Sequence, residues 1–142
     1  MKKTEVSLLV VEDDDVDVAA VRRAFATLKI DNPIVVARNG DEALACLRGD
    51  PGSPPLQAPS IVLLDLNMPK MNGIELLEEI RRDPDLRKAV VFVLTTSNAP
   101  GDRRACYERN VAGYMLKSQT GKSFLDTIAM LRTYWTLNEF PA

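Results

Sequence analysis

Five short apolar runs, each rich in β-branched residues, alternate along this chain with segments of helical periodicity. The runs are Val6–Val11, Ile34–Ala37, Ile61–Leu64, Ala89–Leu94 and Val111–Leu116. Because they are apolar almost throughout, rather than at every second position, they are typical of strands buried on both faces. Their alternation with helices predicts an α/β fold with a single doubly wound five-stranded parallel sheet and right-handed crossovers.

The helical segments carry their own start and stop signals. The second helix follows Asn39-Gly40-Asp41 and ends at Gly49, and the third has Asn72 as a good N-cap and is stopped by Pro84. A more polar fourth helix is expected from about Pro100. These signals predict one helix after each strand.

The length of 142 residues suits one domain with a sizeable core and leaves little for a second. Residues 49–59 are rich in Pro and Gly and predict a surface loop inside that domain. The last helix is expected to begin after Gly121, and with its tail it forms an extended C-terminal segment over residues 121–142. We therefore predict a single domain over residues 1–142.

Composition excludes several classes of function. With 18 Lys and Arg against 20 Asp and Glu, the net charge is −2, which argues against a general nucleic-acid-binding protein. The chain has no histidine, which excludes zinc sites built on imidazole and Ser-His-Asp catalysis. The apolar run near the N-terminus is too short to span a membrane, and the two cysteines fit reduced thiols. We expect a cytoplasmic protein with no nucleic-acid or membrane partner.

Charged and hydroxyl side chains follow the predicted strands at their carboxyl ends, where open α/β sheets form their sites. Glu12 and Asp13 follow the first run, Asp65 the third, Thr95 the fourth and Lys117 the fifth. If the three acids converge, their charges need compensation. Mg²⁺ together with the lysine ammonium would balance them, and Mg²⁺ binds carboxylates and phosphate oxygens. A carboxylate at a strand end can attack phosphorus and become an aspartyl phosphate.

Each of these residues also has a purely structural explanation. The acids after the first run could have no role beyond favouring a helix N-terminus through the helix dipole. Three of them are assigned to capping or solvent: Asp14, Asp15 and Asp17. Thr95 and Thr96 both suit a strand, and we favour Thr95 for the site. Lys117 could be a surface lysine with a buried stem, and Tyr114 a core residue.

Four ordered motifs, LLVVEDDD, IVLLDLNMPKMNG, VFVLTTS and YMLK, resemble the response-regulator receiver domain, the CheY-like family. The resemblance covers nearly the whole chain and implies a flavodoxin-like fold with strand order 2-1-3-4-5. It implies that Asp65 is the phosphoacceptor and that Glu12 and Asp13 are the acidic pair, with Asp13 the direct Mg²⁺ ligand. The other implied roles are the backbone carbonyl of Asn67 as a metal ligand, Thr95 as the switch hydroxyl, Lys117 as the phosphate-binding lysine and Tyr114 as the aromatic that changes rotamer.

The resemblance also implies a partner, a sensor histidine kinase that supplies the phosphoryl group. The chain would then be a phosphoacceptor with self-catalysed phosphotransfer and autodephosphorylation, not a turnover enzyme. The loop before the third strand, the TTSNAP segment and Tyr134-Trp135 resemble single-domain regulators of phytochrome-type kinases. One departure is Ser118, where the family usually has a proline after a cis peptide; cis before a non-proline residue costs about 3–4 kcal/mol.

The last helix carries two apolar stripes. One stripe at helical spacing is expected to face the sheet: Phe124, Ile128, Leu131 and Trp135. The second stripe, Met130, Tyr134 and Leu137, is a candidate interface for a homodimer or an output partner. The alternative is that the tail around Phe140 and Pro141 folds back and covers it.

Two other classes of function remain open at this point. One is a Mg²⁺-dependent phosphohydrolase with an aspartyl intermediate, although the haloacid-dehalogenase pattern has a second Asp where this chain has Asn67. The other is a pseudo-receiver that is never phosphorylated and acts only as an interaction module.

Overall fold

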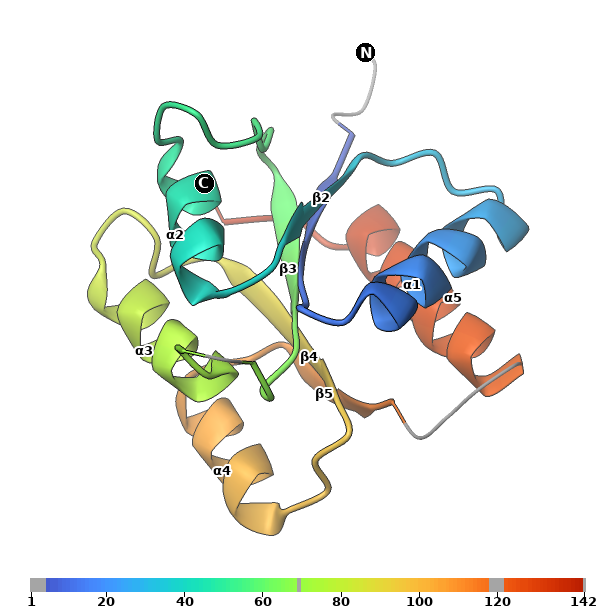
Figure 1. The fold of residues 1–142 in the computed structure, drawn as a ribbon. Coiled ribbons are helices and arrows are strands. Elements are labelled where there is room, and N and C mark those ends of the chain that lie inside the picture. Colours follow the sequence, from blue (N-terminus) through green and yellow to red (C-terminus); the bar gives the residue numbers. More distant parts are fainter. Residues whose placement is uncertain (1–4, 69, 118–121, 142) are drawn as a thin grey trace.

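The computed structural model describes residues 5–68, 70–117 and 122–141, and it contains the expected alternation of strands and helices (Figure 1). The strands are β1 (Ser7–Val11), β2 (Ile34–Ala37), β3 (Ser60–Leu64), β4 (Val90–Thr95) and β5 (Gly113–Leu116). The helices are α1 (Asp15–Thr27), α2 (Gly40–Arg48), α3 (Gly73–Arg82), α4 (Pro100–Glu108) and α5 (Lys122–Leu137). All neighbouring strands pair in parallel in the order β2-β1-β3-β4-β5, so the predicted fold class and strand order are confirmed.

The sheet is covered on both faces, by α1 and α5 on one side and by α2, α3 and α4 on the other (Figure 1). Successive side chains of a strand point to opposite faces. In β1, therefore, Leu8 and Val10 pack with α1 and α5, while Leu9 and Val11 pack in the other core. Burial on both faces explains why the central runs are apolar throughout. The edge strands β2 and β5 are mostly half-buried, because each has a neighbouring strand on one side only.

The start and stop signals at Asn72 and Gly49 act as predicted, and Asn39 caps α2 in addition. The side chain of Asn39 accepts a hydrogen bond from the Glu42 N–H at 2.9 Å. Asn72 and Glu75 form a reciprocal capping box at the start of α3. Gly49 ends α2 in the left-handed conformation, with φ of 70°, which glycine adopts without the steric cost of a Cβ.

Several strand boundaries differ from the prediction by one or two residues, since β1 begins at Ser7, β3 at Ser60 and β4 at Val90. β4 continues through Thr95, whose carbonyl accepts a hydrogen bond from the Lys117 N–H, and β5 begins at Gly113 instead of Val111. Residues 49–59 connect α2 to β3, as expected of the Pro- and Gly-rich loop. The Lys117–Ser118 peptide lies outside the described residues. Among the residues that the structure describes, no helix has the length and apolar character needed to cross a bilayer.

Candidate functional site

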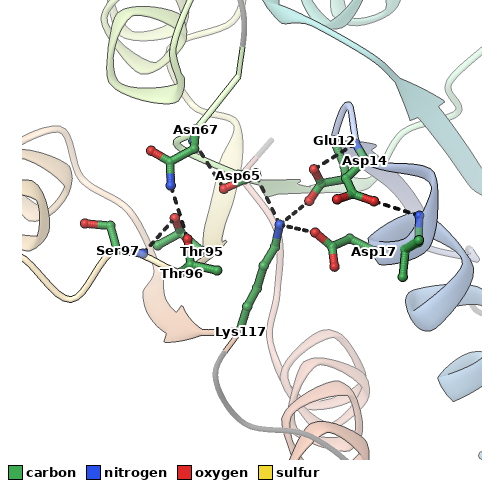
Figure 2. Close-up of polar contacts among 10 residues, drawn as sticks. Glu12, Asp14, Asp17, Asp65, Asn67, Thr95, Thr96, Ser97 and Lys117 are labelled. Carbon is green, nitrogen blue, oxygen red and sulfur yellow. Dashed lines mark hydrogen bonds and ion pairs between the residues drawn. The ribbon is translucent and has the colours of Figure 1, made fainter.

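The site lies at the carboxyl edge of the sheet, where four strands deliver side chains to one place (Figure 2). Glu12 follows β1, Asp65 follows β3, Thr95 ends β4 and Lys117 follows β5. Backbone hydrogen bonds continue the strand pairing into these positions. The Asp65 N–H donates to the Val11 carbonyl at 3.1 Å, and the Lys117 N–H donates to the Thr95 carbonyl at 2.8 Å. The sheet thus positions the side chains through its own hydrogen bonding.

Three carboxylates form a compact acidic cluster. Glu12, Asp13 and Asp65 each offer one oxygen, and these oxygens lie within 4.8 Å of one another. Glu12 and Asp65 are buried, whereas Asp13 is exposed. A group of hard oxygen donors that is open on one side fits a divalent cation that retains water ligands, as Mg²⁺ does. The structure therefore brings together the three acids expected to hold the metal.

The turn that carries Asp65 packs against the start of α3. A Cβ built on Gly73 would lie 2.7 Å from the Asp65 carbonyl oxygen and 2.7 Å from the Leu66 Cα. Backbone atoms cannot move aside as a flexible side chain can, so glycine is required for this close approach. The DLNMPKMNG motif thus supplies both the carboxylate and the residue that lets α3 support it.

Lys117 is surrounded by carboxylates (Figure 2). Its Nζ donates to Asp65 Oδ2 at 3.0 Å, to Asp17 Oδ2 at 2.8 Å and to Glu12 Oε1. Burial lowers the pKa of Lys117, but the hydrogen bonds to the three carboxylates outweigh burial and raise it above its ordinary value. The ammonium therefore stays charged and supplies the positive charge that the acidic cluster needs.

The pKa of Glu12 is raised as well, which for a carboxyl group favours the neutral form. Burial raises its pKa from 4.5 to about 7, and the nearby negative charge of Asp65 adds to this effect. Hydrogen bonds from Lys117 Nζ and from the Asp14 N–H partly oppose it by favouring the carboxylate. A bound divalent cation would favour the ionised form further.

A cavity of about 440 Å³ extends from the charged groups between the sheet, α1 and α5. Its polar end contains Glu12, Asp65 and Lys117, and its apolar wall includes Leu63 and Phe124. This wall places the ion pairs in a medium less polarisable than water, which strengthens their mutual attraction and raises the cost of any unpaired charge.

On the other side of Asp65 lie the hydroxyl groups at the carboxyl end of β4. Thr95 is fully buried, and its Oγ1 accepts a hydrogen bond from the Ser97 N–H at 3.3 Å. Thr96 is exposed and accepts a hydrogen bond from the Asn67 side-chain amide at 3.3 Å. The Asn67 N–H also donates to Asp65 Oδ1 at 3.2 Å. Both threonines therefore lie near the site, and the buried one is the residue favoured from the sequence.

Tyr114, on β5, connects to the same loop. Its hydroxyl donates to the Ser97 carbonyl at 2.9 Å, and its ring packs against the core on the α4 side. Ser97 Oγ in turn donates to the Asp102 carboxylate of α4 at 2.5 Å. Tyr114 is thus half-buried and turned towards the segment that follows Thr95.

Sequence reasoning missed one residue of the site. Asp17 was assigned to capping or solvent together with Asp14 and Asp15, but its carboxylate contacts Lys117. Asp14 does cap α1, since its side chain accepts a hydrogen bond from the Val16 N–H. A signal for Asp17 was present: it lies four residues before the buried Val21, and therefore on the helix face that points to the sheet.

The candidate interface on α5 is divided by the structure. Tyr134 packs edge-on against Phe92 of β4, with ring centroids 4.9 Å apart, and Phe140 of the tail packs edge-on against it at 6.2 Å. The alternative of a tail that folds back therefore describes Tyr134. Met130 and Leu137 are 40% and 77% exposed and remain on the surface.

A sequence model of the response regulator receiver domain matches residues 8–129. The chain belongs to this family. Receiver domains accept phosphoryl groups from sensor histidine kinases and are not enzymes in the ordinary sense of turning over a substrate.

Several receivers associated with phytochromes are similar to this chain. Response regulator Rcp1 of Synechocystis is 36% identical over 128 residues, which cover 90% of this chain and 87% of Rcp1. A crystal structure of the Mn²⁺-bound form of Rcp1 matches with a TM-score of 0.82 and 35% identity, covering 98% of this chain and all of that one. The phosphorylated cyanobacterial phytochrome response regulator RcpA matches with a TM-score of 0.86 and 31% identity, with the same coverage. This receiver is therefore homologous to phytochrome response regulators, and its acidic cluster suggests divalent-metal binding.

Proposed function

We propose that this receiver takes a phosphoryl group from the phosphohistidine of a sensor kinase onto the Asp65 carboxylate. The observation that carries the proposal is the position of Asp65, which is buried, 3.0 Å from the Lys117 ammonium and part of a three-carboxylate cluster. An Asp65 oxygen forms the new bond to phosphorus as the P–N bond to the kinase histidine breaks. The electron pair of that bond returns to the imidazole.

We assign Mg²⁺ as the metal, with Glu12, Asp13, Asp65 and the Asn67 backbone carbonyl as the groups that would hold it. The support is the donor set, which consists of oxygen only and contains no thiolate or imidazole. When bound, the ion would offset the negative charge of the acids and of the phosphoryl oxygens during transfer. Because these charges would be in place before the reaction begins, the transfer would need little reorganisation of the site.

In this proposal Lys117 and Thr95 complete the phosphoryl site. The ammonium moves a hydrogen bond from a carboxylate to a phosphoryl oxygen, and the Thr95 hydroxyl donates a hydrogen bond to another phosphoryl oxygen. The two residues share a backbone hydrogen bond of 2.8 Å, so a shift of one is passed to the other. The Tyr114 side chain, whose hydroxyl donates to the Ser97 carbonyl, then changes rotamer. This change alters the surface on the α4 side when the site is phosphorylated. The conformational shift can be no larger than the difference in phosphoryl contacts between the two states.

We further propose that the kinase is of the phytochrome type, because the similar receivers include Rcp1 and RcpA. The same residues would catalyse both the arrival of the phosphoryl group and its hydrolytic loss. Cys46 and Cys106 are both free and buried, which supports a reducing compartment such as the cytoplasm. A homodimer through α5 stays a proposal that rests on the exposed Met130 and Leu137, and analytical ultracentrifugation measures it directly.

Phosphotransfer from a labelled histidine kinase, with and without Mg²⁺, tests the assignment of Asp65. We expect rapid labelling of the wild-type chain with Mg²⁺ and complete loss of labelling in Asp65→Asn. Asp85→Asn makes the same change at an exposed position after α3 and should be labelled like the wild type. Continued labelling of Asp65→Asn would refute the assignment. A wild-type chain that no kinase or small phosphodonor labels would instead support the interaction-module alternative.

A further inference from the structure

The Lys117 ammonium has a carboxylate partner outside the acidic cluster. An ammonium has three N–H donors, and here Glu12, Asp17 and Asp65 provide an acceptor for each of them. Asp17 comes from the first turn of α1, whereas the other two acids directly follow strands β1 and β3. Figure 2 shows the Asp17 side chain reaching the lysine from the α1 side, beside Glu12. The ammonium is thus fully occupied before any ligand arrives.

Asp17 differs from the other two partners in what it can bind besides the lysine. The group of acids whose oxygens can share one cation consists of Glu12, Asp13 and Asp65, without Asp17. The Asp17 side chain is also 39% exposed, whereas those of Glu12 and Asp65 are buried. A divalent cation and Lys117 therefore compete for Glu12 and Asp65, while Asp17 is left to the lysine alone.

We propose that Asp17 is a positioning residue that holds the Lys117 ammonium when a divalent cation occupies the acidic cluster. The inference rests on the proposed function, since it describes the same site. By taking the ammonium, Asp17 frees Glu12 and Asp65 for the cation and so favours metal binding. For the same reason it competes with a phosphoryl group for the ammonium, and so it weakens phosphoryl binding and shortens the life of the phosphorylated state.

The two effects have opposite signs, which separates this role from a structural one. Without the Asp17 charge, the Lys117 ammonium binds Glu12 and Asp65 more strongly and competes with the cation for them, so metal binding weakens. The same loss removes a competitor for the ammonium, so a phosphoryl group binds more tightly. A partly exposed ion pair of this kind corresponds to about a two- to five-fold change in each equilibrium.

Two titrations of Asp17→Asn by calorimetry test the inference. The first measures Mg²⁺ affinity, and the second measures the affinity for beryllium trifluoride, a phosphoryl analogue, at saturating Mg²⁺. Asp15→Asn is the matched control, because Asp15 lies in the same helical turn but is 82% exposed and paired with Arg38 instead. Asp17→Glu keeps the charge and serves as the rescue variant.

We expect weaker Mg²⁺ binding and tighter analogue binding in Asp17→Asn, values near wild type in Asp15→Asn, and partial recovery in Asp17→Glu. The slower loss of phosphoryl groups from Asp17→Asn should follow the second titration. Equal behaviour of the two Asn variants, or parallel weakening of both affinities with a lowered melting temperature, would overturn the inference alone. A wild-type chain that binds neither Mg²⁺ nor the analogue would overturn the proposed function as well.

Discussion

Two buried or half-buried cations at opposite edges of the sheet have very different partners. At the carboxyl edge, Lys117 donates to carboxylates from three separate elements. At the amino edge, the Arg81 guanidinium donates, among the described residues, only to backbone carbonyls, at 2.8–3.0 Å. The four carbonyls belong to the segments that precede β4 and β5: Arg87, Ala89, Arg109 and Asn110.

The difference in partners makes Lys117 a movable cation, whose contacts a ligand can replace, and Arg81 a fixed cation, whose contacts stay the same. Carboxylates carry charges of their own, so a divalent cation or a phosphoryl group can compete with Lys117 for them or for the lysine. Backbone carbonyls are neutral and held by the fold, so no such exchange is available to Arg81. The contacts of Lys117 can therefore be exchanged for a ligand, while those of Arg81 tie α3 to the segments that precede β4 and β5.

Replacing the movable cation should give the largest effect. In Lys117→Met we expect phosphorylation to slow by about a hundred-fold, as is typical when a donor to a developing anion is removed. The metal-free protein should also lose stability, because three carboxylates then lack their shared cation, and Mg²⁺ should restore it. Labelling rates and thermal melts with and without Mg²⁺ measure both effects, with the exposed Lys88→Met as control. A loss of stability that Mg²⁺ leaves unchanged would contradict the exchange of cations.

Replacing the fixed cation should affect stability only. In Arg81→Met we expect the free energy of unfolding to fall by about 3 kcal/mol, because several charged hydrogen bonds to carbonyls are lost together. Mg²⁺ affinity should stay near that of the wild type, and Mg²⁺ should not offset the loss. Chemical denaturation measures this. Arg82→Met is the matched control, since the neighbouring Arg82 is exposed and forms solvent-accessible ion pairs with Glu78 and Glu79. Equal losses in the two variants would show that the carbonyl contacts are unimportant.

A third cation sharpens the comparison, because it has both kinds of partner. Arg109 donates to the Ala105 carbonyl at 2.8 Å and to the Glu78 carboxylate at 2.5 Å. The hydrogen bond from Arg109 lowers the pKa of Glu78 below its usual value of 4.5. The pair therefore stabilises the fold above that pH, and the contribution disappears as the pH falls through the lowered pKa.

Glu78→Gln should accordingly show the smallest effect, and one that depends on pH. We expect the difference in denaturation midpoint from the wild type to be present near neutral pH and to vanish in acid. The exposed Glu108→Gln should show no comparable dependence. A difference that is constant over the same range would mean that the ion pair contributes nothing through its charge.

The convergence of the site was predictable residue by residue. Glu12, Asp65 and Lys117 each follow an apolar run, and parallel strands end at one edge of their sheet, so knowledge of the strand pattern was enough to place them together. The inward position of Thr95 followed less directly, because Thr96 has the same chemistry and strand preference. The structure buries Thr95, the last residue of β4, and exposes Thr96, which lies just beyond the end of the strand.

The amino-acid sequence by itself determined the order of strands and helices, the caps of α2 and α3, and the edge at which the acids meet. Those properties depend on local periodicity and on the direction of each strand. Only the tertiary structure decided that Asp17 contacts Lys117 and that Tyr134 packs between Phe92 and Phe140. Contacts of helical residues depend on how each helix is rotated and docked against its neighbours, and many distant side chains set that docking together.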